Sequence, residues 1–316
     1  MSKVRVCFLG TPDFAATALK SMLEDDHFEI VGVISQPDRP AGRKMVMTAS
    51  PVKTLALSHG LKILTPESVN KDFMIEQIKS WSAEVAVVVA FGQILSLKFL
   101  EIFRFGAVNI HGSLLPKWRG AAPIQRSLEA GDSETGVTLQ KIVKALDAGD
   151  IIGIRKVTVD ESMQASDLFP QLAKLGCDLL HVELMDYVRG NLSPVPQDHS
   201  AMTVAKKIDK AEAKIDFNQS AEKIHNKVRA FNLGPGTFTF LNGKKIKILK
   251  TSFTAVANVD PAKTGKVTDV TSEFISIQTG AGILKILELQ PESRNKMSVS
   301  EFLKGHDFKI GDIFGN

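Results

Sequence analysis

Three side chains suited to acyl transfer lie where a strand end and a loop can bring them together. Asn109 and His111 are two residues apart in an apolar stretch, so an extended strand places them on one face. Asp147 lies in the loop 146–150. When an amine attacks an acyl carbon, donors such as Asn109 and His111 can stabilise the oxyanion. Asp147 can hold the imidazole in one tautomer and take up the amine proton.

An amine is itself the nucleophile in this chemistry, so no reactive serine or cysteine is needed. An Asn-x-His triplet also has a structural interpretation, because His111 can be a hydrogen-bonded core histidine and Asn109 a turn residue at a strand end. The elements around the triplet therefore decide how much weight it carries.

The first half of the chain alternates between predicted strands and helices. Apolar runs that suit strands buried on both faces are separated by amphipathic segments. The order β-α-β-α-β-α-β predicts an α/β fold with a doubly wound, mostly parallel sheet, Rossmann-like in arrangement. Ligands of such sheets bind beyond the carboxyl ends of the strands. The strands are expected at 3–10, 29–35, 62–64, 85–91 and 108–111, and the helices at 13–23, 51–58 and 71–81.

A second pattern follows further along the chain. A helix at 121–130, strands at 136–142 and 154–159, and a helix at 166–188 complete a predicted domain 1–189. The segment 190–206 contains Pro194 and Pro196 among polar residues and is the expected linker. In 207–316, a helix at 221–230 precedes two predicted hairpins, one of them turned by Asn242-Gly243. Short strands at this density predict a small OB-like β-barrel.

Charge is distributed unevenly between these parts. From Ala201 onward there are 18 Lys and Arg against 12 Asp and Glu, whereas the rest of the chain has 21 against 23. A basic tail on a near-neutral body favours a polyanionic partner for the tail. A chance excess on a solvated surface is the alternative.

Composition excludes several classes of protein. The sequence contains no stretch of 18 or more apolar residues, so no membrane helix is predicted, and the N-terminus lacks the pattern of a signal peptide. Cys7 and Cys177 read as separate core or near-surface residues, and the seven histidines show no ligand spacing with cysteine. We therefore expect a cytoplasmic protein with no metal and no membrane partner.

Several distinctive motifs occur along the chain. The longest is the stretch from Asn109 to Ile124, NIHGSLLPKWRGAAPI, whose WRGAAP part is the narrower signature. Shorter matches occur in order along the chain: GTPDFA at 10–15, DRPAGR at 38–43, DAGD at 147–150, RAFN at 229–232 and LQP at 289–291. Each motif alone is weak, but their order and spacing together are specific. They resemble the folate-dependent formyltransferases, most closely those that act on methionyl-tRNA.

The resemblance implies an enzyme that moves the formyl group of 10-formyltetrahydrofolate to initiator methionyl-tRNA, with Asn109, His111 and Asp147 as its catalytic residues. The implied folate-binding residues lie in two stretches: Phe91, Gly92, Ile94 and Leu95, then Ser113, Leu114, Leu115 and Pro116. The expected tRNA contacts are basic: Arg39, Arg43, Lys44, Lys207, Lys244, Lys245 and Lys247. A monomer is expected.

Rival functions use much of the same chemistry. A formyltransferase acting on an amino sugar nucleotide would keep a similar tail, and one acting on a glycinamide nucleotide would lack it. A hydrolase releasing formate from the same folate would replace the amine with water. A non-catalytic RNA-binding protein would use the sheet only as a scaffold.

Overall fold

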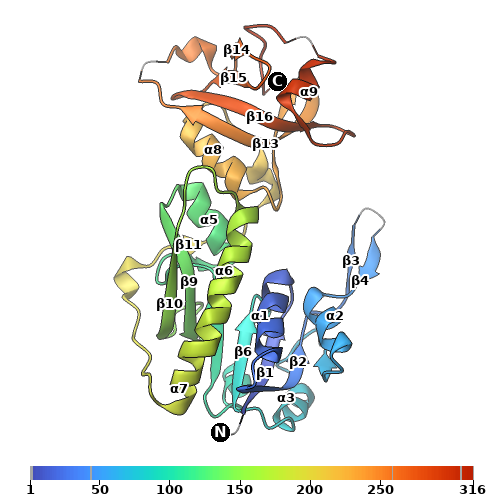
Figure 1. Ribbon diagram of the computed structural model, residues 1–316, viewed down its shortest axis with the longest axis vertical. Coiled ribbons are helices and arrows are strands. Elements are labelled where there is room, and N and C mark those ends of the chain that lie inside the picture. The colour runs from blue at the N-terminus through green and yellow to red at the C-terminus, as the bar shows by residue number, and fades with distance from the viewer. Residues whose placement is uncertain (1–2, 43–44, 258, 307, 316) are drawn as a thin grey trace. The chain divides into compact units, whose positions relative to one another are not determined.

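The computed structural model describes residues 3–42, 45–257, 259–306 and 308–315 (Figure 1). The chain folds into two compact units. The first contains Met1–Pro123, Glu134–Val157 and Phe169–Ala205. The second contains Ile124–Ser133, Thr158–Leu168 and Lys206–Asn316. The second unit thus includes two segments from within 1–189, and the single linker at 190–206 stays a prediction.

The first unit is built on a seven-stranded sheet with the order β10-β9-β7-β6-β1-β2-β5. Strands β1, β2, β5, β6 and β7 pair in parallel, and β9 runs antiparallel to β7. The predicted mostly parallel α/β sheet is therefore confirmed. The strands are β1 (Val4–Gly10), β2 (Phe28–Ile34), β5 (Ile63–Leu64), β6 (Val85–Val89), β7 (Ala107–His111), β9 (Glu134–Lys141) and β10 (Ile151–Thr158).

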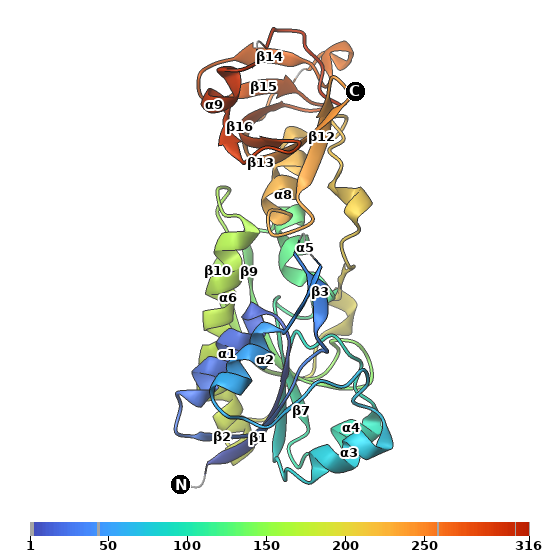
Figure 2. The ribbon, with the colours of Figure 1, turned by 90° about the vertical axis from the view of Figure 1, so that its right-hand side faces the viewer.

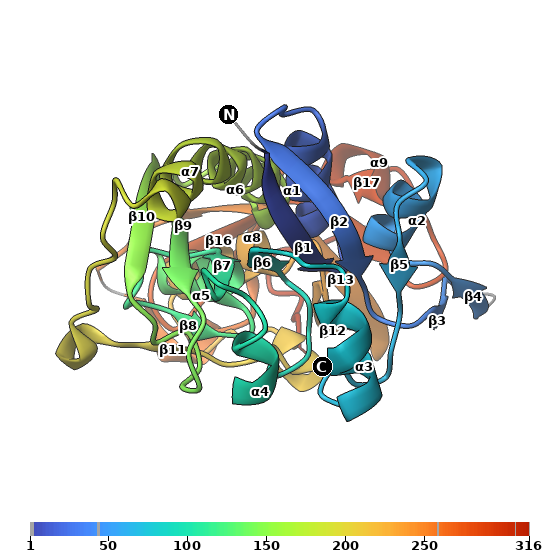
Figure 3. The ribbon, with the colours of Figure 1, turned by 90° about the horizontal axis from the view of Figure 1, so that it is seen from below.

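Helices cover both faces of this sheet. Figure 3 shows α1, α6 and α7 on one side and α3 and α4 on the other. Every residue of β6 is buried, as a strand covered on both faces requires. The helices are α1 (Asp13–Leu23), α2 (Pro51–Ser58), α3 (Asp72–Lys79), α4 (Leu97–Leu100), α6 (Ala165–Leu179) and α7 (Met185–Arg189), and the π-helical turn η1 (Leu180–Leu184) joins the last two.

Small residues allow close approach on each face. A Cβ on Gly176 of α6 would lie 3.0 Å from Cγ2 of Ile110, so the helix packs directly on β7. On the other face, a Cβ on Gly32 of β2 would lie 2.2 Å from the ring of Trp81. Asn109 and His111 alternate with Ile110 and therefore face the side of the sheet opposite α6.

Two short strand pairs in the first unit were not predicted. β3 (Arg39–Ala41) pairs antiparallel with β4 (Val46–Thr48). β8 (Arg119–Gly120) pairs in parallel with β11 (Val204–Ala205). Pro12 occupies the N-cap position of α1 without a side-chain capping bond, and Asp13 is the first helical residue. Its carboxylate there still interacts favourably with the helix dipole.

The second unit contains an antiparallel sheet with the order β12-β13-β16-β15-β14, and β17 pairs with β16 (Figure 2). Two bridges, Leu241 with Phe314 and Lys266 with Ile313, connect the edge strands β12 and β14 to one C-terminal segment. The sheet is thereby drawn toward closure, as a small barrel requires. Its strands are β12 (Thr237–Leu241), β13 (Lys244–Thr254), β14 (Val267–Val270), β15 (Ile275–Gln278), β16 (Ile283–Pro291) and β17 (Met297–Ser298).

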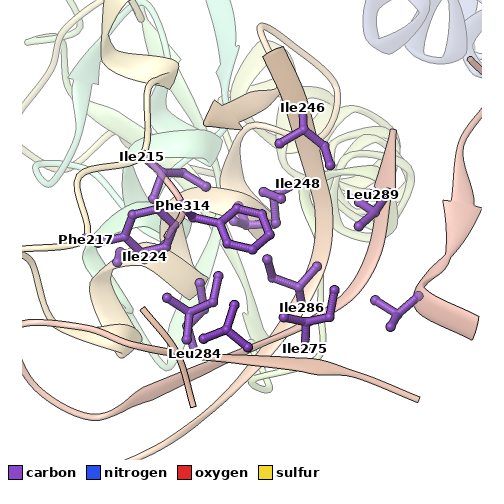
Figure 4. Packing of buried hydrophobic residues seen from close by; sticks show 14 of the residues in the cluster. Ile215, Phe217, Ile224, Ile246, Ile248, Ile275, Leu284, Ile286, Leu289 and Phe314 are labelled. Carbon is purple, nitrogen blue, oxygen red and sulfur yellow. The ribbon is translucent and has the colours of Figure 1, made fainter. Parts of the chain in front are cut away.

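Alternating apolar residues fill the interior of this sheet. Ile246 and Ile248 of β13 face the same core as Leu284 and Ile286 of β16 (Figure 4). The predicted Asn242-Gly243 turn is confirmed, with φ of 50° and 72°, the positive values that a type I′ turn needs. The helices of this unit are α5 (Pro123–Ala130), α8 (Ala221–Ala230) and α9 (Val299–Leu303). Within the described part of the chain, no helix has both the length and the apolar character of a membrane span.

Candidate active site

The end of β7 presents two of the predicted catalytic side chains. Asn109 lies opposite Val88 of β6 and Gln140 of β9, which fixes its place in the sheet. The His111 side chain is only 6% exposed. Among the residues described, none forms a hydrogen bond with the half-buried side-chain amide of Asn109. Its N–H donors are therefore available to a substrate oxygen.

Asp147 approaches His111 from the loop that follows β9. Its carboxylate Oδ2 accepts a hydrogen bond from the backbone N–H of Gly120 at 2.8 Å, and Oδ1 accepts one from Nε2 of Gln140 at 3.1 Å. Oδ2 also lies 3.7 Å from Nδ1 of His111, which is ion-pair distance and longer than a hydrogen bond. The structure thus brings the three predicted residues together.

A backbone carbonyl determines which nitrogen of His111 carries the proton. Nε2 of His111 lies 2.9 Å from the carbonyl oxygen of Trp118. A carbonyl only accepts, so Nε2 must donate its N–H. In the neutral ring Nδ1 then carries the open lone pair, on the side facing Asp147. The imidazole is therefore arranged to accept a proton at Nδ1, with a carboxylate nearby to stabilise the resulting cation.

The turn after β7 is held by its own hydrogen bonds. Ser113 is fully buried, and its hydroxyl donates to the carbonyl of Lys117 at 2.7 Å. The hydroxyl of Thr138 donates to the carbonyl of Ser113 at 2.7 Å and accepts the N–H of Leu115 at 3.1 Å. These bonds return the chain to Trp118. They give Ser113 a structural role, and folate binding by Ser113, Leu114, Leu115 and Pro116 stays a prediction.

The second predicted folate segment follows β6. Its backbone is fastened at Phe91, whose carbonyl accepts the Thr11 hydroxyl and the Gln36 amide, both at 3.1 Å. Ile94 is 85% exposed, whereas Phe91 and Leu95 are buried. An apolar side chain exposed to this degree on a fastened loop can meet a ligand. Binding by Phe91, Gly92, Ile94 and Leu95 stays a prediction.

The predicted tRNA contacts fall in both units. In the first, Arg39 of β3 pairs with Glu67 at 2.9 Å, and both side chains are exposed. Arg43 and Lys44 lie outside the described residues. In the second, all four lysines are exposed, and the ammonium of Lys245 lies 3.9 Å from the centroid of the Phe238 ring. These four are Lys207, Lys244, Lys245 and Lys247.

Sequence reasoning missed the groups that hold the site in place. Gln140 is 1% exposed and lies in β9, which is buried at every position from Thr135 to Gln140. A buried amide in such a strand needs a partner, and that need is the signal that could have identified it. The Gly120 N–H and the Trp118 carbonyl are backbone groups, which side-chain patterns do not reveal.

The cysteines are separate from this site. Burial raises the pKa of the Cys7 thiol, and burial is also the main cause of the raised pKa of Cys177. Raised values disfavour thiolates, so neither cysteine is suited to nucleophilic attack. Across the described ranges no group of three or more His, Cys, Asp or Glu is arranged to hold a metal ion.

Comparison with known proteins gives the chain its family. Residues 3–182 match the family model described as formyl transferase, and residues 207–307 match the one described as formyl transferase, C-terminal domain. The chain therefore belongs to the formyl transferase family.

Relatives of full length narrow this placement. A methionyl-tRNA formyltransferase of Bdellovibrio bacteriovorus is 60% identical over 317 residues, covering 100% of both chains. One of Pseudoalteromonas translucida is 39% identical over 314 residues, covering 99% of this chain and 98% of the relative. These matches assign the chain to the methionyl-tRNA formyltransferase branch of the family.

Solved structures support the fold. The crystal structure of WlaRD, a sugar 3N-formyl transferase, matches with a TM-score of 0.65 and 21% identity over 93% of this chain and 100% of that one. An N-formyltransferase from Helicobacter canadensis matches with a TM-score of 0.64 and 21% identity over 90% of this chain and 99% of that one. At these identities the likeness shows the fold alone.

Proposed function

We propose that this chain transfers the formyl group of 10-formyltetrahydrofolate to the amino group of methionyl-tRNA, giving N-formylmethionyl-tRNA for translation initiation. The observation that carries the proposal is the grouping of Asn109, His111 and Asp147 in a chain 60% identical over its full length to a methionyl-tRNA formyltransferase. The full-length relatives favour this acceptor over an amino sugar nucleotide and over water.

The chemistry follows from the direction of the hydrogen bonds. The amine lone pair attacks the formyl carbon, and the carbonyl electrons move onto oxygen, where the free amide of Asn109 can donate to the oxyanion. The amine proton passes to Nδ1 of His111, and Asp147 stabilises the imidazolium. The oxyanion electrons then re-form the carbonyl, the bond from carbon to the folate nitrogen breaks, and that nitrogen takes the proton from Nδ1.

This assignment refines the role first expected for His111. The sequence predicted an imidazole that donates to the oxyanion and an Asp147 that sets the tautomer. The Nε2–H of His111 donates to the Trp118 carbonyl, so the other ring nitrogen, Nδ1, is the one suited to accept a proton, and it faces Asp147. The Asp147 carboxylate already accepts hydrogen bonds from Gly120 and Gln140, so we infer that it acts as a fixed counter-charge to the His111 imidazolium.

The remaining partners are proposed on the residues named above. Phe91, Gly92, Ile94, Leu95 and the Ser113–Pro116 turn are the proposed folate contacts. The proposed tRNA contacts are Arg39, Arg43 and Lys44 in the first unit and Lys207, Lys244, Lys245 and Lys247 in the second, because basic side chains bind phosphates. A monomeric state and a cytoplasmic location stay predictions.

An acceptor comparison tests the activity. The purified chain is incubated with 10-formyltetrahydrofolate and one of three additions: methionyl-tRNA, an amino sugar nucleotide, or buffer alone. We expect formylated methionyl-tRNA in the first reaction and no product in the other two. Formylation of the sugar nucleotide, or release of formate in buffer, would contradict the proposal and identify which rival function applies.

A further inference from the structure

The segment between α7 and β11, predicted to be a linker, contains a buried residue, Gln197, that has no role in the proposed reaction as described above. Gln197 is 5% exposed, whereas its neighbours Pro196 and Asp198 are exposed. Burying a carboxamide is unfavourable unless its donors and acceptor are all satisfied. The contacts of Gln197 therefore indicate what the segment is fastened to.

The side-chain nitrogen of Gln197 faces the loop that carries Asp147. Nε2 of Gln197 lies 2.9 Å from the carbonyl oxygen of Asp147 and 2.6 Å from that of Gly149. It also lies 3.2 Å from Oε1 of Gln140. Two N–H groups are thus shared among three acceptors: two backbone carbonyls of the loop that carries Asp147, and the side chain of Gln140, which binds the Asp147 carboxylate.

Arg119 determines which way the Gln197 amide points. Nε and Nη2 of Arg119 lie 3.1 and 2.6 Å from Oε1 of Gln197. A guanidinium only donates, so the oxygen of Gln197 must face Arg119 and its nitrogen must face the loop. Arg119 is itself 8% exposed, which keeps water from competing for these bonds.

The same reasoning extends through Gln140. Because Oε1 of Gln140 accepts from Gln197, its nitrogen is left to donate to Oδ1 of Asp147 at 3.1 Å. A flipped Gln140 would place an oxygen against the carboxylate. The order Arg119, Gln197, Gln140, Asp147 is therefore a relay in which every hydrogen bond has a fixed direction.

We propose that Gln197 is a positioning residue for formyl transfer: held by Arg119, it fixes Asp147 beside His111 both directly and through Gln140. This inference rests on the proposed function and deepens it. Arg119 is well placed to couple the parts, since Trp118 on one side supplies the carbonyl that binds His111 and Gly120 on the other supplies the N–H that binds Asp147. A displaced carboxylate would stabilise the imidazolium less well, whereas substrate contacts would be kept.

Gln197→Glu tests the proposal with a change of the same shape. The carboxylate still accepts from Arg119, so that buried charge stays paired, but both donors toward the Asp147 loop are lost. We expect kcat to fall about 100-fold, the size of effect that a misplacement of about 1 Å causes. KM for either substrate should change by less than about twofold, as expected for a loss confined to the transition state. Ser193→Ala, at an exposed position of the same segment, is the matched control and should retain wild-type kcat.

A double variant separates positioning from a general structural role. If Gln197 acts through Asp147, adding Gln197→Glu to Asp147→Asn should cost less than about twofold more, because residues acting as a unit are not additive. The full 100-fold loss in that background would overturn the proposal. So would a folded Gln197→Glu enzyme with wild-type kcat.

A second variant covers the case in which Gln197→Glu does not fold, and the wild-type chain tests the proposed function separately. Should Gln197→Glu fail to fold, Gln140→Met removes the last donor of the relay and must show the same loss of kcat with unchanged KM; wild-type kcat there would also overturn the proposal. The wild-type chain runs in the same assay. If it does not formylate methionyl-tRNA, the proposed function has failed, whatever the Gln197 variants do.

Discussion

Two buried histidines in different units share one contact and differ in another. In the first unit, Nε2 of His111 lies 2.9 Å from the Trp118 carbonyl; in the second, Nε2 of His225 lies 2.9 Å from the Glu161 carbonyl. Nδ1 of His225 is also satisfied, by the Thr251 hydroxyl at 2.9 Å. Nδ1 of His111 instead faces a carboxylate at 3.7 Å, beyond hydrogen-bond distance.

The difference separates a structural histidine from a reactive one. His225 has a partner on each nitrogen, so it ties α8 to β13 and to the segment Thr158–Leu168 within the second unit. His111 keeps one lone pair available, next to a group that stabilises the protonated ring. Burial alone does not indicate function; the unused hydrogen-bonding capacity does.

The largest effect is expected when the His111 imidazole is removed. His111→Ala should lower kcat about 10³-fold, within the range general acid–base catalysis contributes, with tRNA affinity nearly unchanged. Single-turnover formylation with saturating methionyl-tRNA measures it. Wild-type turnover in this variant would remove His111 from the mechanism.

A smaller loss is expected at the neighbouring amide. Asn109→Ala removes one donor to the oxyanion and should lower kcat about 100-fold, the usual effect of a single such donor. Steady-state kinetics with both substrates varied should show KM for folate and tRNA little changed. A rise in KM at constant kcat would instead assign Asn109 to ground-state binding.

His225, whose two ring nitrogens both have hydrogen-bond partners, should affect stability and not turnover. His225→Ala leaves the partners Thr251 and Glu161 with one bond fewer and should lower the free energy of unfolding by about 1–3 kcal/mol. Urea unfolding measures this loss, and formylation by the folded fraction should keep the wild-type kcat. A variant that is stable but inactive would contradict the structural role.

The pH dependence of stability sharpens the same contrast. Burial, with help from the nearby Arg229 charge, lowers the pKa of His225, although the bond to the Glu161 carbonyl opposes the shift. Below a pH of about 6.5 the unfolded chain therefore binds a proton that the folded chain resists. The contribution of His225 is complete above that pH and is lost as the pH falls toward its folded pKa. Unfolding at pH 7.5 and 5.5 should show a smaller decline for His225→Ala than for the wild type; equal declines would refute this assignment.

The smallest effect concerns the basic surface of the second unit. Lys245→Ala should raise KM for tRNA a few-fold, leave kcat unchanged, and reduce the slope of log affinity against log salt by about one. Filter binding over a range of salt concentrations measures that slope. An altered kcat at saturating tRNA would show that the second unit contributes to more than binding.

Local signals account for the parts of the fold that were predicted to the residue. The helices Asp13–Leu23, Pro51–Ser58 and Ala221–Ala230 begin and end where their apolar periodicity does, and Ser50 and Ser220 cap the last two. The shared face of Asn109 and His111 likewise followed from the two-residue period of a strand.

What the sequence did not reveal depends on contacts between distant segments. The pairing of β8 with β11 joins Arg119 to Val204, and two residues per strand carry no recognisable pattern. Gln197 read as part of a polar linker because its burial arises only when that segment folds back on the Asp147 loop. The roles of Trp118 and Gly120 rest on backbone groups, which the side-chain identity at a position does not specify.

The tautomer of His111 tests the central claim most directly. Nitrogen-15 NMR of the histidine-labelled enzyme, at a pH where the His111 ring is neutral, distinguishes a proton on Nε2 from one on Nδ1. The account predicts the proton on Nε2, directed at the Trp118 carbonyl, with Nδ1 unprotonated and ready to accept the amine proton. A neutral ring protonated on Nδ1 would contradict it.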